Sequence, residues 1–340
     1  MKELRFFLGV AVCCTLLAAC KQKSTIDLVK QKAAGELLRT EMKSNDLDSV
    51  VVLMMTTSTG EVRMQFKMVN DPVKKKFVFT SVARAEMEIE PGVLVAPFAV
   101  MAAMDESGAN MDESVDAGTG RLEINGRTYV DDEASAKGGY GFINLSRCIT
   151  LPSTVGLVNF VDLSFNQKSS EFVKRMNAMS FGAPSEKSPF AQTEITPALV
   201  GDYTVGKSFK LTPTQILTAW NGLANNGKVM APTFVEMDTT TLNASMCNPT
   251  TVQAMRDLVV ANGASECSST TGLGFYKTVT ISEESQLVTG AFCSFYPAVN
   301  PTYSYLVLVY HTNENGVSTH TVLNTVKTAG KKVLFGLAAL

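Results

Sequence analysis

Residue types able to do acid–base, nucleophilic or metal chemistry are few in this chain, and their spacing matches no common catalytic motif. The only histidines, His311 and His320, come late and have no cysteine or acidic cluster beside them, so we expect surface residues rather than metal ligands. The pair Glu283-Glu284 and the run Asp131-Asp132-Glu133 are typical of solvated loop charges. No G-x-S-x-G, Walker or G-x-G-x-x-G motif is present, so neither a metal nor another cofactor is expected.

The N-terminus carries two basic side chains, Lys2 and Arg5, followed by an apolar run up to Ala19. This run is too short to span a bilayer comfortably as a mature helix and predicts a secretory signal over residues 1–19. Its last four residues, Leu17-Ala18-Ala19-Cys20, resemble the lipobox of bacterial lipoproteins, in which the cysteine becomes the first mature residue and carries lipid. Cys20 is therefore the expected lipidation site, whereas an ordinary cleaved signal or an uncleaved anchor would leave this cysteine incidental.

The rest of the chain divides into a short N-terminal segment and one large domain. Residues 20–45 comprise the lipidated cysteine, a polar tether and an expected helix, and residues 46–340 form the domain. With 340 residues, 45% of them hydrophobic, the chain can bury a sizeable core. Its 30 basic and 32 acidic side chains do not indicate a nucleic-acid partner. We expect an exported protein held at the membrane by lipid, as a periplasmic or outer-membrane lipoprotein.

Four cysteines remain in the domain once Cys13, Cys14 and Cys20 are set aside. Their spacing fits no zinc site, and the remaining residues are Cys148, Cys247, Cys267 and Cys293. In an oxidising compartment two disulfides could form, with Cys247 and Cys267 as the nearest pair, and four buried free thiols are the alternative.

An unusual helix start follows the turn at Pro91-Gly92. The next residues are Val93, Leu94, Val95 and Ala96, although a helix N-terminus is where a hydroxyl cap or a reactive group is expected. The segment therefore has the outline of a functional helix start without a side chain that could react.

The elements that position this helix come from both ends of the chain. Apolar spacing predicts a helix from Leu28 to Met42, and residues 49–68 predict a hairpin that turns at Gly60. Residues 211–236 predict a helix and then a strand, the segments QLVTGAFCSFYP and TYSYLVLVYH predict a second hairpin, and residues 317–340 predict a closing helix. This order favours one sheet built from both chain ends with helices on its faces.

Six segments resemble landmarks of the penicillin-binding protein transpeptidase domain and occur in that family's order. They are MTTSTGEVRM, EPGVLVAPFAVMAAMDESG, LSRCITLPSTVGLVNF with Phe181-Gly182, KLTPTQILTAWNGLANNGKVMAPTFVE, FYKTVTIS, and GAFCSFYPAVNPTYSYLVLVYH. The resemblance implies the α/β fold (α+β) of transpeptidases and β-lactamases, in which an antiparallel sheet is flanked by helices and joined by a helical subdomain. It also implies the family's chemistry, in which a serine attacks a D-Ala-D-Ala amide or a β-lactam and a lysine one turn later takes its proton.

The residues that should do this chemistry are missing from the matching positions. The resemblance places Val93 where the family has its nucleophilic serine and Ala96 where it has the lysine. No serine precedes any lysine by three residues anywhere in the chain. In the second motif, Pro152 replaces the serine and Thr154 the asparagine, so the donor and the amide are both lost.

The third motif is partly kept. In the segment KTVT, Lys277, Thr278 and Thr280 match the family, while Val279 replaces a glycine that lets ligand approach the strand, and we expect this valine to fill part of that space. A second register, STTGLG at residues 269–274, is less favoured because it loses the lysine. Lys277 could also be a solvated edge charge.

The resemblance and the missing residues together predict a catalytically inactive transpeptidase homologue. We expect it to bind peptidoglycan stem peptides or a cell-wall synthesis protein through the former substrate groove, with Lys277, Thr278 and Thr280 as groove residues. The alternative is an active transpeptidase or carboxypeptidase whose nucleophile has moved, for example to Ser153 or Thr154.

Overall fold

The computed structural model describes residues 23–340 with short gaps. The gaps are residues 72, 75, 81–87, 132–133, 135, 182–189, 191–194, 268–271, 283–285 and 314–317. The expected signal at 1–19, Cys20 and the pair Glu283-Glu284 therefore lie outside the described residues.

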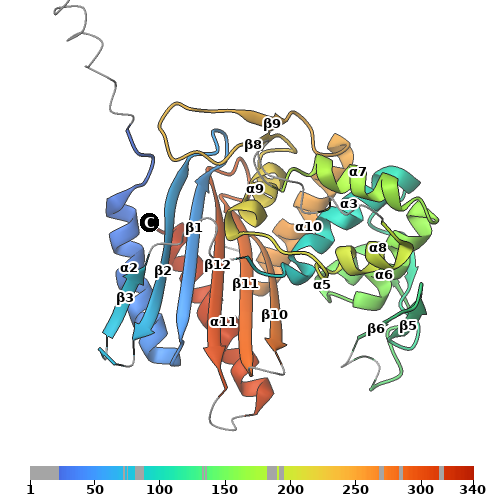
Figure 1. Ribbon diagram of the computed structural model, residues 1–340, viewed down its shortest axis with the longest axis horizontal. Coiled ribbons are helices and arrows are strands. Elements are labelled where there is room, and N and C mark those ends of the chain that lie inside the picture. The colour runs from blue at the N-terminus through green and yellow to red at the C-terminus, as the bar shows by residue number, and fades with distance from the viewer. Residues whose placement is uncertain are drawn as a thin grey trace, which may run out of the picture.

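A six-stranded antiparallel sheet forms the centre of the molecule, and its strands come from both ends of the chain (Figure 1). The strands are β1 (Ser49–Thr56), β2 (Val62–Asp71), β3 (Lys76–Thr80), β10 (Gly274–Ser282), β11 (Leu287–Tyr296) and β12 (Tyr303–Thr312). Their order is β10-β11-β12-β1-β2-β3, so the first strand pairs with the last, with Leu53 opposite Leu306. Strands β10 and β3 form the two edges.

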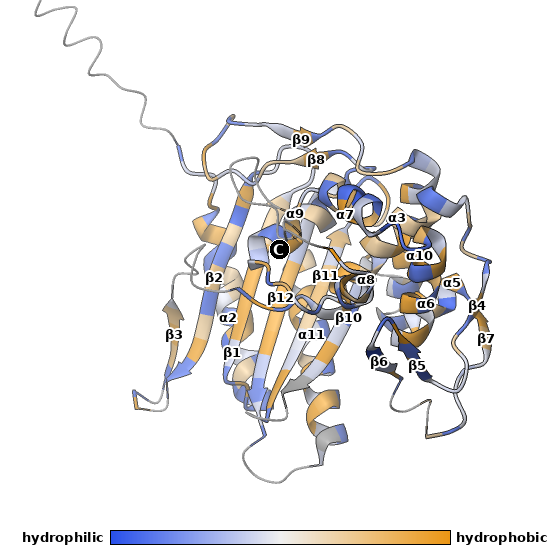
Figure 2. Ribbon diagram, turned by 45° about the vertical axis from the view of Figure 1, so that its right-hand side comes forward, coloured by the Kyte–Doolittle hydropathy of each residue, from blue (hydrophilic) through white to orange (hydrophobic). Residues whose placement is uncertain are grey.

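Helices cover both faces of the sheet, so alternate residues of β1 belong to different hydrophobic cores. Val50 and Val52 pack with α2 (Leu28–Asn45) and α11 (Thr319–Ala338), whereas Val51 and Leu53 pack against the helical half of the molecule. Asp27 fixes the start of α2 by accepting hydrogen bonds from the first helical amides. Figure 2 shows the apolar central strands between these two layers.

The helical half surrounds one central helix, α3 (Ala96–Ser107), which follows the short 3-10 helix η1 (Gly92–Val95). Every residue from Ala96 to Met104 is buried, as expected for a helix that is apolar on all sides. Around it lie α5 (Leu145–Thr150), α6 (Thr154–Phe165), α7 (Ser169–Ala178), α8 (Pro197–Thr204), α9 (Pro213–Ala224) and α10 (Pro249–Cys267). Three short strand pairs complete this half: β4 (Ser114–Asp116) with β7 (Phe142–Asn144), β5 (Arg121–Ile124) with β6 (Arg127–Val130), and β8 (Val229–Met230) with β9 (Thr241–Asn243).

The predicted architecture is confirmed: a sheet made from both ends of the chain, flanked by helices, with a helical subdomain. The expected helix at 28–42 extends to Asn45, and the closing helix begins at Thr319. Both predicted hairpins are present as β1-β2 and β11-β12. Within the described part of the chain, no helix is long and apolar enough to cross a membrane.

The cysteines do not form the disulfide that the sequence favoured. Cys148, Cys247 and Cys293 are free thiols, so the pairing of Cys247 with Cys267 is wrong. The reason is α10, whose 19 residues span about 27 Å at 1.5 Å per residue and separate these two cysteines. Cys247 Sγ instead donates to the carbonyl of Met101 at 3.5 Å. Burial raises the pKa of the Cys148 thiol to about 12, which keeps it protonated.

Candidate functional site

Two glycines in left-handed conformations fix the turn that begins η1 and α3. The φ angles of Gly92 and Gly206 are 55° and 70°, and the Gly92 amide donates to the Gly206 carbonyl at 3.2 Å. A Cβ on Gly206 would overlap the backbone of Gly92, so only glycine allows this approach. Ile89 and Leu211 exchange two backbone hydrogen bonds of 2.9 Å just before the turn. The backbone of this helix start is therefore held from two sides.

The side chains presented by this helix start are hydrocarbon. Ala96 is completely buried, and the half-buried Val93 packs against a small cluster that includes Val155 and Tyr129. No side chain caps η1 or α3. The structure thus places Val93 at a helix start near the start of α6. The side chains of Val93 and Ala96 offer no atom there that could attack a carbonyl or move a proton.

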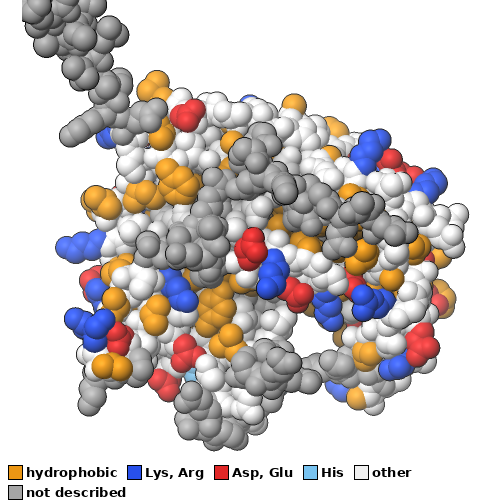
Figure 3. Space-filling model, viewed as in Figure 1, with side chains coloured by type: hydrophobic (Ala, Val, Ile, Leu, Met, Phe, Trp, Pro, Cys, Tyr) orange, Lys and Arg blue, Asp and Glu red, His pale blue; other side chains and the backbone are white. Residues whose placement is uncertain are grey.

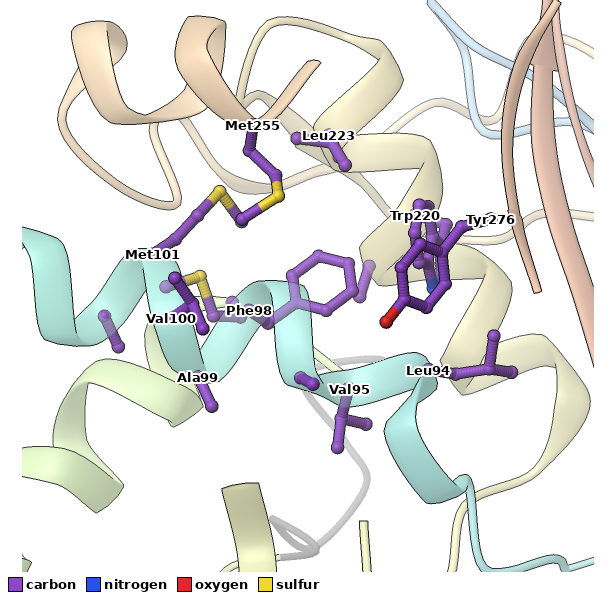
Figure 4. Close-up of a cluster of buried hydrophobic side chains, with 14 of the residues drawn as sticks. Leu94, Val95, Phe98, Ala99, Val100, Met101, Trp220, Leu223, Met255 and Tyr276 are labelled. Carbon is purple, nitrogen blue, oxygen red and sulfur yellow. The ribbon is translucent and has the colours of Figure 1, made fainter. Parts of the chain in front are cut away.

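Tyr276 of β10 packs an aromatic ring beside this helix start. Its ring centroid lies 5.4 Å from that of Trp220, which in turn makes an edge contact with Phe98 at 5.5 Å. Figure 4 shows the phenol lying between Phe98 and Leu94. Its hydroxyl contacts the Ile149 carbonyl at 3.5 Å, and burial raises the pKa of Tyr276, so the phenol stays neutral. The space next to the start of α3 is therefore filled by a neutral aromatic side chain.

The hydroxyl of Ser153 serves as the N-cap of α6. Ser153 Oγ accepts from the Gly156 amide at 3.0 Å and donates to Asp131 Oδ2 at 2.5 Å, while Asp131 Oδ1 accepts from the Val155 amide at 3.2 Å. Ser153 is only 1% exposed. Asp131 is buried as well, so the prediction of a solvated loop charge is wrong for this residue, because its carboxylate binds the start of α6. Thr154 follows as the first helical residue and is half-buried, and Pro152 is exposed.

Strand alternation separates the three residues that the sequence assigned to the groove. Lys277 lies opposite Phe292, on the face that packs against α11, whereas Thr278 and Thr280 point to the opposite face, toward η1. Thr280 Cγ2 would lie 3.9 Å from a Cβ placed on Gly92. Val279 also packs on the α11 face, so the expectation that it fills the groove is wrong.

Lys277 belongs to an ion cluster on the α11 side. Glu266 Oε2 accepts from Lys277 Nζ at 2.5 Å and from Lys331 Nζ at 2.6 Å. Burial alone would raise the pKa of Glu266, but the two ammonium groups outweigh it and hold that pKa below its ordinary value. Burial lowers the pKa of Lys277, against the opposing effect of Glu266. The amine is therefore engaged away from Val93.

Among the described residues, no group of three histidine, cysteine or acidic side chains is placed to hold a metal ion. His311 Nδ1 contacts the Asp46 carbonyl at 2.9 Å, and His320 Nε2 contacts Asn324 at 2.9 Å; His311 is half-buried and His320 is exposed. The exposed position of His320 agrees with the surface location that the sequence predicted, and His311 is partly covered at the end of β12.

The site that results lies where the edge strand β10 meets the η1 turn, with Thr278 and Thr280 on β10 and Val93 on η1. Sequence reasoning missed Tyr276 and Glu266. The signal for Tyr276 was available, because a strand that points Thr278 and Thr280 toward the helical half must point Tyr276 there too. Glu266 had no comparable signal, since its contact with Lys331 joins residues 65 positions apart.

Comparisons with known proteins identify a family. The family described as "Penicillin binding protein transpeptidase domain" matches residues 50–327. A search of curated proteins gives no match. Among solved structures, the transpeptidase domain of Burkholderia pseudomallei penicillin-binding protein 3 superposes with a TM-score of 0.71 at 16% identity, covering 94% of this chain and 96% of that one. A peptidoglycan glycosyltransferase from Burkholderia ambifaria gives 0.70 at 17% identity, covering 93% and 95%. At these identities the two structures show a shared fold.

Proposed function

Since this chain belongs to the penicillin-binding protein transpeptidase family, we propose that it is a catalytically inactive member, anchored to the membrane by lipid, that binds peptidoglycan stem peptides. A cell-wall synthesis protein is the other candidate ligand for the same groove. One observation carries the proposal: the rigid start of α3 carries Val93 and Ala96 where acyl transfer needs a nucleophile and its base. The fold is kept and the reacting groups are absent.

The packing around α3 supports this reading. A nucleophilic hydroxyl needs a partner that accepts its proton. Beside α3, Tyr276 supplies a neutral ring instead, and the ammonium of Lys277 binds Glu266 on the other face of the sheet. A serine introduced by a single substitution at Val93 would face the cluster that includes Val155 and Tyr129 rather than a base.

A displaced nucleophile has less support. The hydroxyl of Ser153 is buried and occupied at both its donor and acceptor positions, so attack on a substrate would break the cap of α6. Thr154 lies in the first turn of the same helix. The alternative is an active enzyme that uses Thr154 as its nucleophile, and a covalent label on Thr154 would reveal it.

The β10 edge of the sheet has features that suit an extended peptide. Strand β10 is an edge of the sheet, and edge strands bind peptides through main-chain hydrogen bonds. Thr280 is exposed there and Thr278 is buried, and both side chains lie on the face of β10 that is turned toward η1. The proposed ligand pairs with this edge and places polar groups on the two threonines.

Lipid attachment is the second part of the proposal, and it rests on the lipobox at Leu17 to Cys20. Growth with a fatty acid that carries a chemical handle should label the protein, and Cys20→Ser should abolish the label. A labelled Cys20→Ser variant would contradict the assignment.

The groove is tested with a synthetic stem pentapeptide that ends in D-Ala-D-Ala. We expect reversible binding by calorimetry that weakens in Thr280→Val, because the valine keeps the shape and loses the hydroxyl. Thr80→Val on the other edge strand is the matched control and should bind as the parent does. If the parent protein does not bind the pentapeptide, the peptide proposal is refuted. If fluorescent penicillin labels the protein covalently, the proposal that it is catalytically inactive is refuted.

A further inference from the structure

We propose that one end of the molecule lies directly on the lipid bilayer and inserts Leu28, Val29, Phe234 and Met237 among the lipid headgroups. This inference rests on the proposed membrane attachment near residue 20. We name these four residues, on the first turn of α2 and the segment after β8, the apolar end patch.

The apolar end patch is unusually exposed for large hydrophobic side chains. Met237 is 92% exposed, Val29 80%, Leu28 73% and Phe234 37%. Val299 in the β11-β12 loop and the C-terminal Leu340 are also exposed at this end of the sheet. Figure 3 shows hydrophobic side chains at the upper left of the view, over the ends of β1 and β2. Apolar side chains gathered in this way indicate an interaction surface.

Backbone contacts join the two segments of the patch into one rigid surface. The Thr25 amide donates to the Phe234 carbonyl at 3.1 Å, and the Glu236 amide donates to the Lys23 carbonyl at 2.9 Å. The side chains of Lys23 and Glu236 also form an ion pair of 2.9 Å. The chain entering α2 is therefore fixed to the segment that carries Phe234 and Met237.

The backbone conformation at position 237 is unfavourable for a methionine. Its φ angle is 64°, in the left-handed region, where glycine or asparagine is preferred. The turn is closed by a hydrogen bond from the Asp238 amide to the Val235 carbonyl at 3.4 Å. A methionine at this tip is strained and nearly fully exposed, so water gives it no stabilising contact, whereas a lipid interface does.

The short chain between residue 20 and Lys23 indicates that the apolar end patch contacts lipid. Lys23 is already fixed to Glu236, and Cys20 precedes it by three residues. Three extended residues reach at most about 11 Å. A bilayer that holds residue 20, by acyl chains or by the uncleaved apolar run, must therefore lie within that distance of Lys23, whose neighbours form the patch. The polar tether expected before the helix is therefore short, because Thr25 and Asp27 are already bonded into the domain.

The test places a fluorescent reporter in the patch. Met237→Trp is compared with Leu163→Trp, whose site on α6 is 69% exposed and lies in the helical half of the molecule. Both full-length proteins are purified from membranes and reconstituted into phosphatidylethanolamine–phosphatidylglycerol vesicles with brominated acyl chains. The native Trp220 is buried and contributes equally to both. We expect a blue shift and bromine quenching for Met237→Trp and neither for Leu163→Trp.

Other outcomes separate this inference from the proposed function. Quenching at position 237 without fatty-acid label on Cys20 would keep the patch and refute lipidation. Label on Cys20 without quenching at position 237, or equal quenching of Leu163→Trp, would overturn the inference. Leu28→Ser with Val29→Ser should weaken the quenching of Met237→Trp, and an unchanged signal would overturn the inference as well.

Discussion

Replacing Ser153 by alanine should destabilise the protein without changing any reaction with β-lactams. The substitution removes the cap of α6, worth about 1 kcal/mol. It also removes a hydrogen bond to the buried carboxylate of Asp131, worth about 1.5–3 kcal/mol. The two contributions share one hydroxyl, so we expect the free energy of unfolding to fall by about 2–3 kcal/mol rather than by their full sum.

Urea unfolding followed by Trp220 fluorescence measures this loss, since the chain has a single tryptophan and it is buried in the core. Ser164→Ala is the matched control on the same helix, because Ser164 Oγ only donates to the Phe160 carbonyl at 2.8 Å, and we expect a change within about 0.5 kcal/mol. A loss below about 1 kcal/mol for Ser153→Ala would refute the structural role. Loss of a covalent penicillin label would show that Ser153 is a nucleophile.

Three further predictions concern the ion cluster, the thiols and the aromatic filling. Glu266→Gln should lower the free energy of unfolding by about 1 kcal/mol at pH 7. Because the pKa of Glu266 in the folded protein is below its ordinary 4.5, the difference between parent and variant is complete above pH 4.5 and disappears as the pH falls through the folded pKa. Urea unfolding at a series of pH values measures this difference. Cys247 should be alkylated in denaturant without reductant, and mass spectrometry that finds it in a disulfide would contradict the structure. Tyr276→Ala should lower the free energy of unfolding by about 3–5 kcal/mol, and Tyr276→Phe by less than about 1 kcal/mol, as measured by thermal or urea unfolding. Equal losses in the two variants would show that the hydroxyl rather than the ring stabilises the fold.

The fold followed from local patterns, since the alternating and helical spacings that define a core are readable from sequence. Helix α2 and both hairpins have the predicted type and order. The Pro91-Gly92 turn also marked the helix start correctly, because a left-handed glycine is a local requirement.

The site was only partly predictable, because its contacts join distant segments. Asp131 looked like a loop charge until its carboxylate was placed on Ser153, 22 residues away. Lys277 was assigned to the groove by its motif alone, although strand alternation places its side chain on the other face of the sheet from Thr278 and Thr280. Its partner Glu266 depends on how the end of α10 meets α11, which no short pattern encodes.

The intact mass of the full-length protein after incubation with excess benzylpenicillin tests directly whether the transpeptidase fold has lost its acyl-transfer chemistry, as we propose. We expect an unchanged mass, because neither Val93 nor Ala96 carries a nucleophilic atom. A relative that retains the serine and lysine serves as the positive control. A mass increase of one penicilloyl group that disappears when a single serine or threonine is replaced would show that the protein is an active acyl-transfer enzyme.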